Sequence, residues 1–318
     1  MDTGTGRDAE SALTPDERAL LADLRAASSL ADLQSLFDVD DEHEAYFAAK
    51  REWTDLHERR RHTDEGDGLP GDAVTIDGTT FHVHGITHAD TDEEGRFLRR
   101  HVSQFVDAGH AVLCEQGIRP MYFSDFPAVS AMDDYRWATA RCRDRGLDSS
   151  VSSMLPPGFD SLADDIESLT SEFRRATFSL IEAGSDVYGD VFAAALGDLA
   201  SDFLTGYEGM ATGAEYESFT KSRRAARNPA ELVHLQRYYR AAFLPQPVER
   251  EWLRRHDPKL ELVTHARNER LADYAVYHAD DAETVHLVVG AAHQPGVVYY
   301  LERFRDGERR LDGFELAD

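Results

Sequence analysis

Three side chains suited to one chemical site come from well-separated parts of the sequence. His88 lies three residues after Gly85 in the stretch GITH, and His293 lies three residues after Gly290 in GAAH. Glu115 directly follows the apolar run AVLC. Two imidazoles and one carboxylate, with positions left open to water, suit a catalytic divalent metal ion. Such an ion lowers the pKa of bound water and polarises a carbonyl, so the set predicts hydrolysis chemistry.

A fourth candidate is Arg267, which opens the stretch RNERLA with Asn268 beside it. A guanidinium stays charged at all relevant pH values and could hold a carboxylate or a developing oxyanion. A surface ion pair with Glu269 or Asp273 accounts for the same arginine and, taken alone, is the simpler interpretation.

The elements that must position these residues repeat one order, which is strand, Gly-x-x-His, helix. The two copies are FHVHGITH…GRFLRRHV and HLVVGAAH…GVVYYLERF. Ligand crevices of open α/β sheets form at the carboxyl ends of strands, where glycine permits a tight turn and close backbone approach. We therefore expect two related halves facing each other across a pseudo-twofold, with His88, Glu115 and His293 converging. Alternatively, each histidine is a solvated or capping residue. Rings more than about 12 Å apart would exclude a shared ion, since bonds to the metal are about 2 Å long.

The wider pattern predicts an α/β fold with a mixed central sheet, a large helical insertion and an N-terminal helical extension. Strands are expected near 74–76, 80–85, 111–114, 283–290 and 310–316, and helices over 93–109, 260–278 and after His293. The extension, residues 1–70, begins with Thr14 as a helix N-cap and Pro15 in the first helical position. A Gly- and Asp-rich break near residue 70 leads into the α/β domain, 71–318, whose middle, 124–256, is expected to be mostly helical.

Further histidines lie on the predicted strands. His82 and His84 have no copy in the second half, where Leu287 and Val289 stand, so we expect them to pack or to support the site. His286 corresponds to Phe81 and is expected to be structural.

The charge of the chain excludes several partners. The formal net charge is -26, and the lysines are Lys50, Lys221 and Lys259 alone. A nucleic-acid backbone is bound by clustered Lys and Arg, and anionic membranes also attract basic segments, so neither is an expected partner. A surface rich in carboxylates and poor in lysine indicates a halophilic cytoplasmic protein, with an ordinary acidic protein as the alternative.

Localisation follows from what the 318-residue sequence lacks. No run of eighteen apolar residues predicts a membrane span, and the acidic N-terminus does not have the pattern of a secretion signal. Cys114 and Cys142 are too few for a disulfide framework or a thiolate cluster, so a reducing cytoplasm is expected.

Together, these motifs resemble the TraB/PrgY/Tiki superfamily and, more distantly, the erythromycin esterases and the haem-binding ChaN proteins. The resemblance rests on GITH at 85–88, CEQG around Glu115, RNERLA at 267–272 and GAAHQPG at 290–296, and covers roughly 73–120 and 260–317. The family typically shows a Gly-Ala-x-His-x-Pro-Gly stretch between its last core strand and helix. The chain lacks the hydrophobic C-terminal helices of archaeal TraB proteins, so it resembles a divergent, soluble member.

The resemblance implies a mixed α/β fold of two related halves with a hydrolase site. Tiki proteins are metal-dependent peptidases, other relatives hydrolyse macrolide esters without an evident metal, and the TraB and PrgY branch is tied to peptide-pheromone shutdown. It implies a Mn, Co or Zn ion on His88, Glu115 and His293, with Glu115 as third ligand or general base. Arg267 would stabilise the oxyanion, together with Asn268, and the substrate would be a peptide, an amide or an ester. Two alternatives stand: a non-catalytic protein that sequesters a peptide or haem-like ligand in the same crevice, and a fold that keeps these residues without activity.

Overall fold

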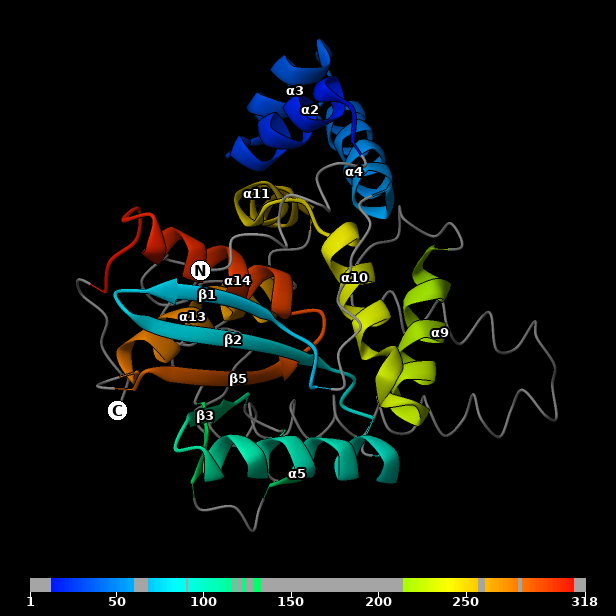
Figure 1. Cartoon of the computed structure of the whole chain (residues 1–318). Coiled ribbons are helices and arrows are strands. Elements are labelled where there is room, and N and C mark those ends of the chain that lie inside the picture. The colour runs from blue at the N-terminus through cyan, green and yellow to red at the C-terminus, as the bar shows by residue number, and fades with distance from the viewer. Residues whose placement is uncertain are drawn as a thin grey trace, which may run out of the picture.

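The structure is a computed structural model of the chain. It describes residues 13–59, 68–89, 91–115, 118, 122–123, 128–132, 214–256, 261–279 and 282–311. Within these residues the fold is mixed α/β, as the sequence predicted, with helices on both faces of a five-stranded sheet (Figure 1).

The sheet has the order β1-β2-β5-β3-β4. Its strands are β1 (Asp72–Ile76), β2 (Thr79–Ile86), β3 (Ala111–Cys114), β4 (Val129–Ala131) and β5 (Thr284–Gly290). β1 runs antiparallel to β2, while β2, β5, β3 and β4 pair in parallel. The β1–β2 hairpin turns at Asp77 and Gly78, which both have positive φ (49° and 95°), as the tight turn of a twisted hairpin requires.

Parallel pairing places the carboxyl ends of β2, β5 and β3 at one edge of the sheet. Ile86 at the end of β2 pairs with Gly290 at the end of β5, and Cys114 of β3 pairs with Val288. The two Gly-x-x-His stretches thus leave neighbouring strands. Gly85 permits this closeness, because a Cβ there would lie only 2.8 Å from the Cα of Ala291.

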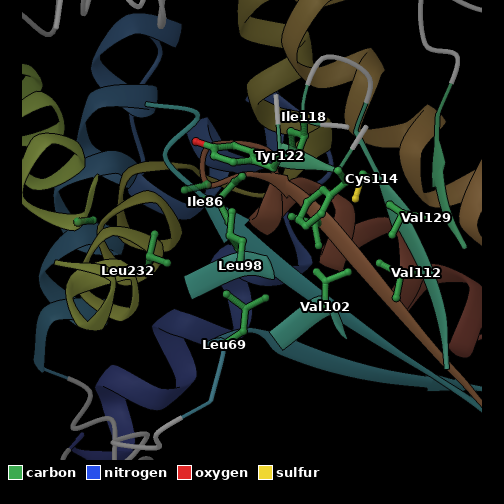
Figure 2. Close-up of a cluster of buried hydrophobic side chains, with 14 of the residues drawn as sticks. Leu69, Ile86, Leu98, Val102, Val112, Cys114, Ile118, Tyr122, Val129 and Leu232 are labelled. Carbon is green, nitrogen blue, oxygen red and sulfur yellow. The ribbon is translucent and has the colours of Figure 1, made fainter. Parts of the chain in front are cut away.

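One face of the sheet is covered by α5 (Asp92–Asp107), which begins after the N-cap Thr91. Its Leu98 and Val102 belong to the same buried cluster as Ile86 and Val112 of the sheet (Figure 2). This packing fixes α5 beside the turn that leaves β2.

The other face is covered by α13 (Arg267–Tyr277) and α14 (Gln294–Arg305). Leu271 of α13 and Val297 of α14 are fully buried in one cluster with Phe81, Val83 and Leu287 of the strands. A short π-helix, η5 (Glu261–Ala266), leads into α13. Wide turns of this kind occur often at functional sites.

The N-terminal helices are α2 (Pro15–Ala26), α3 (Leu30–Phe37) and α4 (Glu42–Arg59). The predicted N-cap is confirmed: Thr14 forms a capping box with Glu17. These helices share their core with α11 (Gln246–His256), and the ring of Trp252 stacks 4.1 Å from that of Tyr46. The extension therefore packs on a helix of the middle region (Figure 1).

The middle region contributes α9 (Ala214–Arg227), η4 (Pro229–Glu231), α10 (Leu232–Ala242) and α11 within the described residues. It also contributes β4, where only helix was predicted, because three residues are too short to show a periodic pattern. The strand predicted at 310–316 lies mostly outside the described residues, and Arg310 and Leu311 are not in a strand. In the described ranges, no helix combines the length and apolarity needed to cross a bilayer.

Candidate functional site

The structure brings His88, Glu115 and His293 together at the carboxyl edge of the sheet. His88 Nε2 lies 3.4 Å from Glu115 Oε2, and His293 Nε2 lies 3.6 Å from Glu115 Oε1. One carboxylate therefore lies against both imidazoles, far inside the separation that would have excluded a shared site. Both rings are slightly exposed, with side-chain accessibilities of 12% and 14%, whereas Glu115 is buried.

Glu115 is a buried carboxylate held ionised by its neighbours. Its Oε1 lies 2.8 Å from Arg267 Nη2, and its Oε2 accepts a 2.7 Å hydrogen bond from the backbone N–H of Gly290. Burial by itself would raise the pKa of Glu115, but Arg267, followed by His293 and His88, holds that pKa well below its ordinary value. At neutral pH the site therefore contains a fixed negative charge beside two imidazoles.

Arg267 belongs to the site and not to a surface ion pair. Glu269 and Asp273, the alternative partners on the same helix, form their ion pairs with Arg250 and Arg309. Arg267 stands at the first residue of α13, where it reaches the end of β3.

His88 has a strained backbone that a buried clamp maintains. Its φ of 58° is left-handed, which costs a residue other than glycine about 1–3 kcal/mol. Thr87 donates its backbone N–H and its hydroxyl to Glu94 of α5, each over 2.7 Å, and Tyr122 donates its hydroxyl to the same carboxylate. The ring of His88 lies against Gly290, where an added Cβ would come within 2.7 Å of Nε2.

His293 is oriented by the amide of Asn268. Its Nδ1 lies 2.8 Å from Asn268 Oδ1. An amide oxygen only accepts hydrogen bonds, so Nδ1 carries a proton and the neutral ring presents its Nε2 lone pair on the side of Glu115. Asn268 is thus a supporting residue of the site, reached through the imidazole.

The donor types suit a divalent ion, but the arrangement does not present them to one. Each oxygen of Glu115 already has a hydrogen-bond donor, and the donor on Oε1 is the guanidinium cation of Arg267. Among the described residues, no group of three His, Cys, Asp or Glu side chains is arranged to hold a metal ion. The metal expected from the sequence stays a prediction.

The remaining strand histidines lie apart from this carboxylate. His82, His84 and His286 stack on one another between the sheet and α5, and Phe105 stacks on His286 at 3.6 Å. They pack as expected. The sequence analysis did not find the N–H of Gly290 or the Glu94 clamp, because neither has a local pattern that marks its partner.

The site can perform general-base chemistry. An ionised carboxylate stabilises the imidazolium formed when a neighbouring histidine takes a proton from water. Comparison of the chain with models of known families, with curated proteins and with solved structures returns no match. The TraB/PrgY/Tiki resemblance therefore stays a prediction carried by the motif residues.

Proposed function

We propose that the protein is a hydrolase that acts on a peptide or amide bond, or on an ester, at the His88–Glu115–His293 site. The observation that carries the proposal is one buried, ionised carboxylate flanked by two slightly exposed imidazoles from neighbouring strand ends. Structural ion pairs rarely need two histidines of this kind, whereas catalytic sites place perturbed carboxylates beside proton acceptors.

Each residue has a role in this proposal. His293 Nε2 takes the proton of an attacking water, and Glu115 stabilises the imidazolium that results. His88 contacts the other carboxylate oxygen and donates a proton to the leaving group. Arg267 keeps Glu115 ionised and adds positive charge where the oxyanion develops.

The proposal includes membership of a TraB/Tiki-like family and a cytoplasmic location. The four motifs of the resemblance support the first, since their chemically active residues meet at one place. A Mn, Co or Zn ion would supply a more acidic water. Nucleic acid and membranes are not partners in this proposal, because of the acidic charge.

The test begins with elemental analysis of protein purified without a histidine tag. The protein is then stripped with a chelator, reloaded separately with Mn, Co or Zn, and screened at high salt on amide and ester substrates, beside the stripped form. Glu115→Gln should lower kcat/KM by roughly 100-fold or more while the circular dichroism spectrum is kept. The matched control is Glu302→Gln on α14, whose carboxylate pairs with Arg305 away from the site.

The outcomes separate the alternatives. Turnover that Glu115→Gln removes and Glu302→Gln keeps supports the hydrolase. Binding of a peptide or haem-like ligand that survives Glu115→Gln, without turnover under any metal, supports a sequestering protein instead. If His88→Gln changes only stability, with neither turnover nor binding in the wild type, the site is a relic.

A further inference from the structure

We infer that Gln246 is a positioning residue that, through Asn268, selects which nitrogen of His293 faces the site, with His265 fixing the amide of Gln246. The inference rests on the proposed function for its catalytic meaning. Its structural content is independent of any substrate.

The residues form one chain of hydrogen bonds that ends at the site. His293 Nδ1 lies 2.8 Å from Asn268 Oδ1, and Asn268 Nδ2 donates to Gln246 Oε1 over 3.1 Å. His265 Nδ1 lies 3.0 Å from the same oxygen of Gln246. Gln246 belongs to α11, so a helix that carries no site residue contacts the site through this chain.

The polarity of the chain determines the tautomer of His293. Gln246 Oε1 only accepts, so both Asn268 Nδ2 and His265 Nδ1 donate to it. With its nitrogen committed to Gln246, Asn268 presents its oxygen to His293 and takes up the proton on Nδ1. A reversal of Gln246 would have to reverse Asn268 and His265 as well, and His293 would then carry its proton on Nε2.

Packing keeps the chain in place. Gln246, Asn268 and His265 are all nearly inaccessible, at 2%, 2% and 4% exposed. Asn268 lies against Gly296, where an added Cβ would overlap its Nδ2. Burial lowers the pKa of His265 to about 4, so its ring is neutral and has a single N–H at neutral pH.

The chemical consequence is a ready proton acceptor. A histidine with its proton on Nδ1 offers the lone pair of Nε2 to a water beside Glu115. A histidine with its proton on Nε2 would offer none there. Gln246 therefore acts on the reaction without touching the substrate.

The test reads the tautomer directly. Long-range proton–nitrogen NMR spectra of the full, nitrogen-labelled protein are recorded at a pH where the imidazoles are neutral, with His293 assigned from its absence in His293→Gln. The wild type should show the Nδ1-protonated form of His293. Gln246→Leu should populate the Nε2-protonated form, whereas Gln246→Glu, which keeps an acceptor oxygen, should preserve the wild-type pattern.

The matched control is Gln236→Leu, the same change at another buried amide, which donates to the carbonyl oxygen of Gly85. It should leave the His293 tautomer unchanged. An Nε2-protonated His293 in the wild type, or an Nδ1-protonated one in Gln246→Leu, overturns the inference.

Activity is a separate readout. Once a substrate is found, Gln246→Leu should lower kcat/KM roughly 10–100-fold, as loss of a supporting partner typically does. The NMR result with no substrate at all would leave the hydrogen-bond chain standing and count against the hydrolase. Turnover with no NMR change would do the reverse.

Discussion

The ion pair of Arg267 with Glu115 is the strongest electrostatic contact of the site, since Glu115 is buried and Arg267 lies 2.8 Å from it. Removing one partner of a buried pair leaves an uncompensated charge. We expect Arg267→Met to lower the free energy of unfolding by about 3–5 kcal/mol at neutral pH.

The pH dependence of that loss has a definite sign. In the wild type the lowered pKa of Glu115 adds stability above the ordinary carboxyl pKa, and this is lost as pH falls through the lowered value. Without Arg267, burial raises the pKa instead, so the difference between wild type and variant should grow from acid to neutral pH. Urea unfolding across this range measures it, with Arg267→Met/Glu115→Gln as control. A difference independent of pH would contradict the assignment.

Gly290 is required at the end of β5 because the ring of His88 occupies the space of a side chain. We expect Gly290→Ala to destabilise the protein by about 1–3 kcal/mol and to shift the His88 imidazole resonances. Gly68→Ala is the control, since nothing lies within 4 Å of a Cβ there. Equal, small effects of both changes would show that the His88 ring can move away without cost.

At the scale of elements, β2, β5 and the turn before β3 are joined by a chain of imidazoles. His110 Nδ1 contacts His286 Nε2 over 3.0 Å, His286 Nδ1 contacts His84 Nε2 over 2.9 Å, and His84 Nδ1 donates to the carbonyl of Pro70. A carbonyl only accepts, so each neutral ring donates through Nδ1. Protonation of His84 or His286 would bring two N–H groups together.

This chain predicts sensitivity to acid. Burial, with contributions from neighbouring histidines, lowers the pKa of His84 to about 4 and that of His286 to about 3. The unfolded chain binds protons first, so stability is complete above about pH 6.5 and falls as pH drops toward 4, by about 3 kcal/mol for His84. Thermal unfolding at a series of pH values should show this slope, reduced in His84→Phe and kept in His234→Gln, which alters an exposed residue. An unreduced slope in His84→Phe would contradict this origin.

At the scale of the whole molecule, the N-terminal helices are joined to the α/β domain through a buried lysine. Lys50 of α4 pairs with the fully buried Glu249 of α11, which also accepts hydrogen bonds from Tyr46 and from the backbone of Leu244. In a chain with three lysines, this one lies in the junction between two parts.

We expect Lys50→Met to lower the free energy of unfolding by about 3–5 kcal/mol, because Glu249 would stay buried without its cation. The double variant Lys50→Met/Glu249→Leu should recover most of the loss, since it removes both charges. Denaturant unfolding measures the three proteins in one series. A single variant as stable as the wild type would show that the junction does not depend on this pair.

The sequence by itself determined what neighbouring residues encode. Thr14 and Pro15 mark a helix start within a few positions, and the strands and the α5 helix follow from local apolar periodicity. It also singled out His88, Glu115 and His293, because each follows a strand, and strand ends of parallel sheets share an edge.

Only the tertiary structure decided which partners these residues have. Gly290 donates to Glu115 from 175 positions away, and Gln246 reaches Asn268 from another helix. The position of β5 between β2 and β3, the partner of Arg267 and the chain of imidazoles arise the same way. Periodicity and capping record local geometry, whereas these contacts depend on how distant elements pack, and no local pattern carries that information.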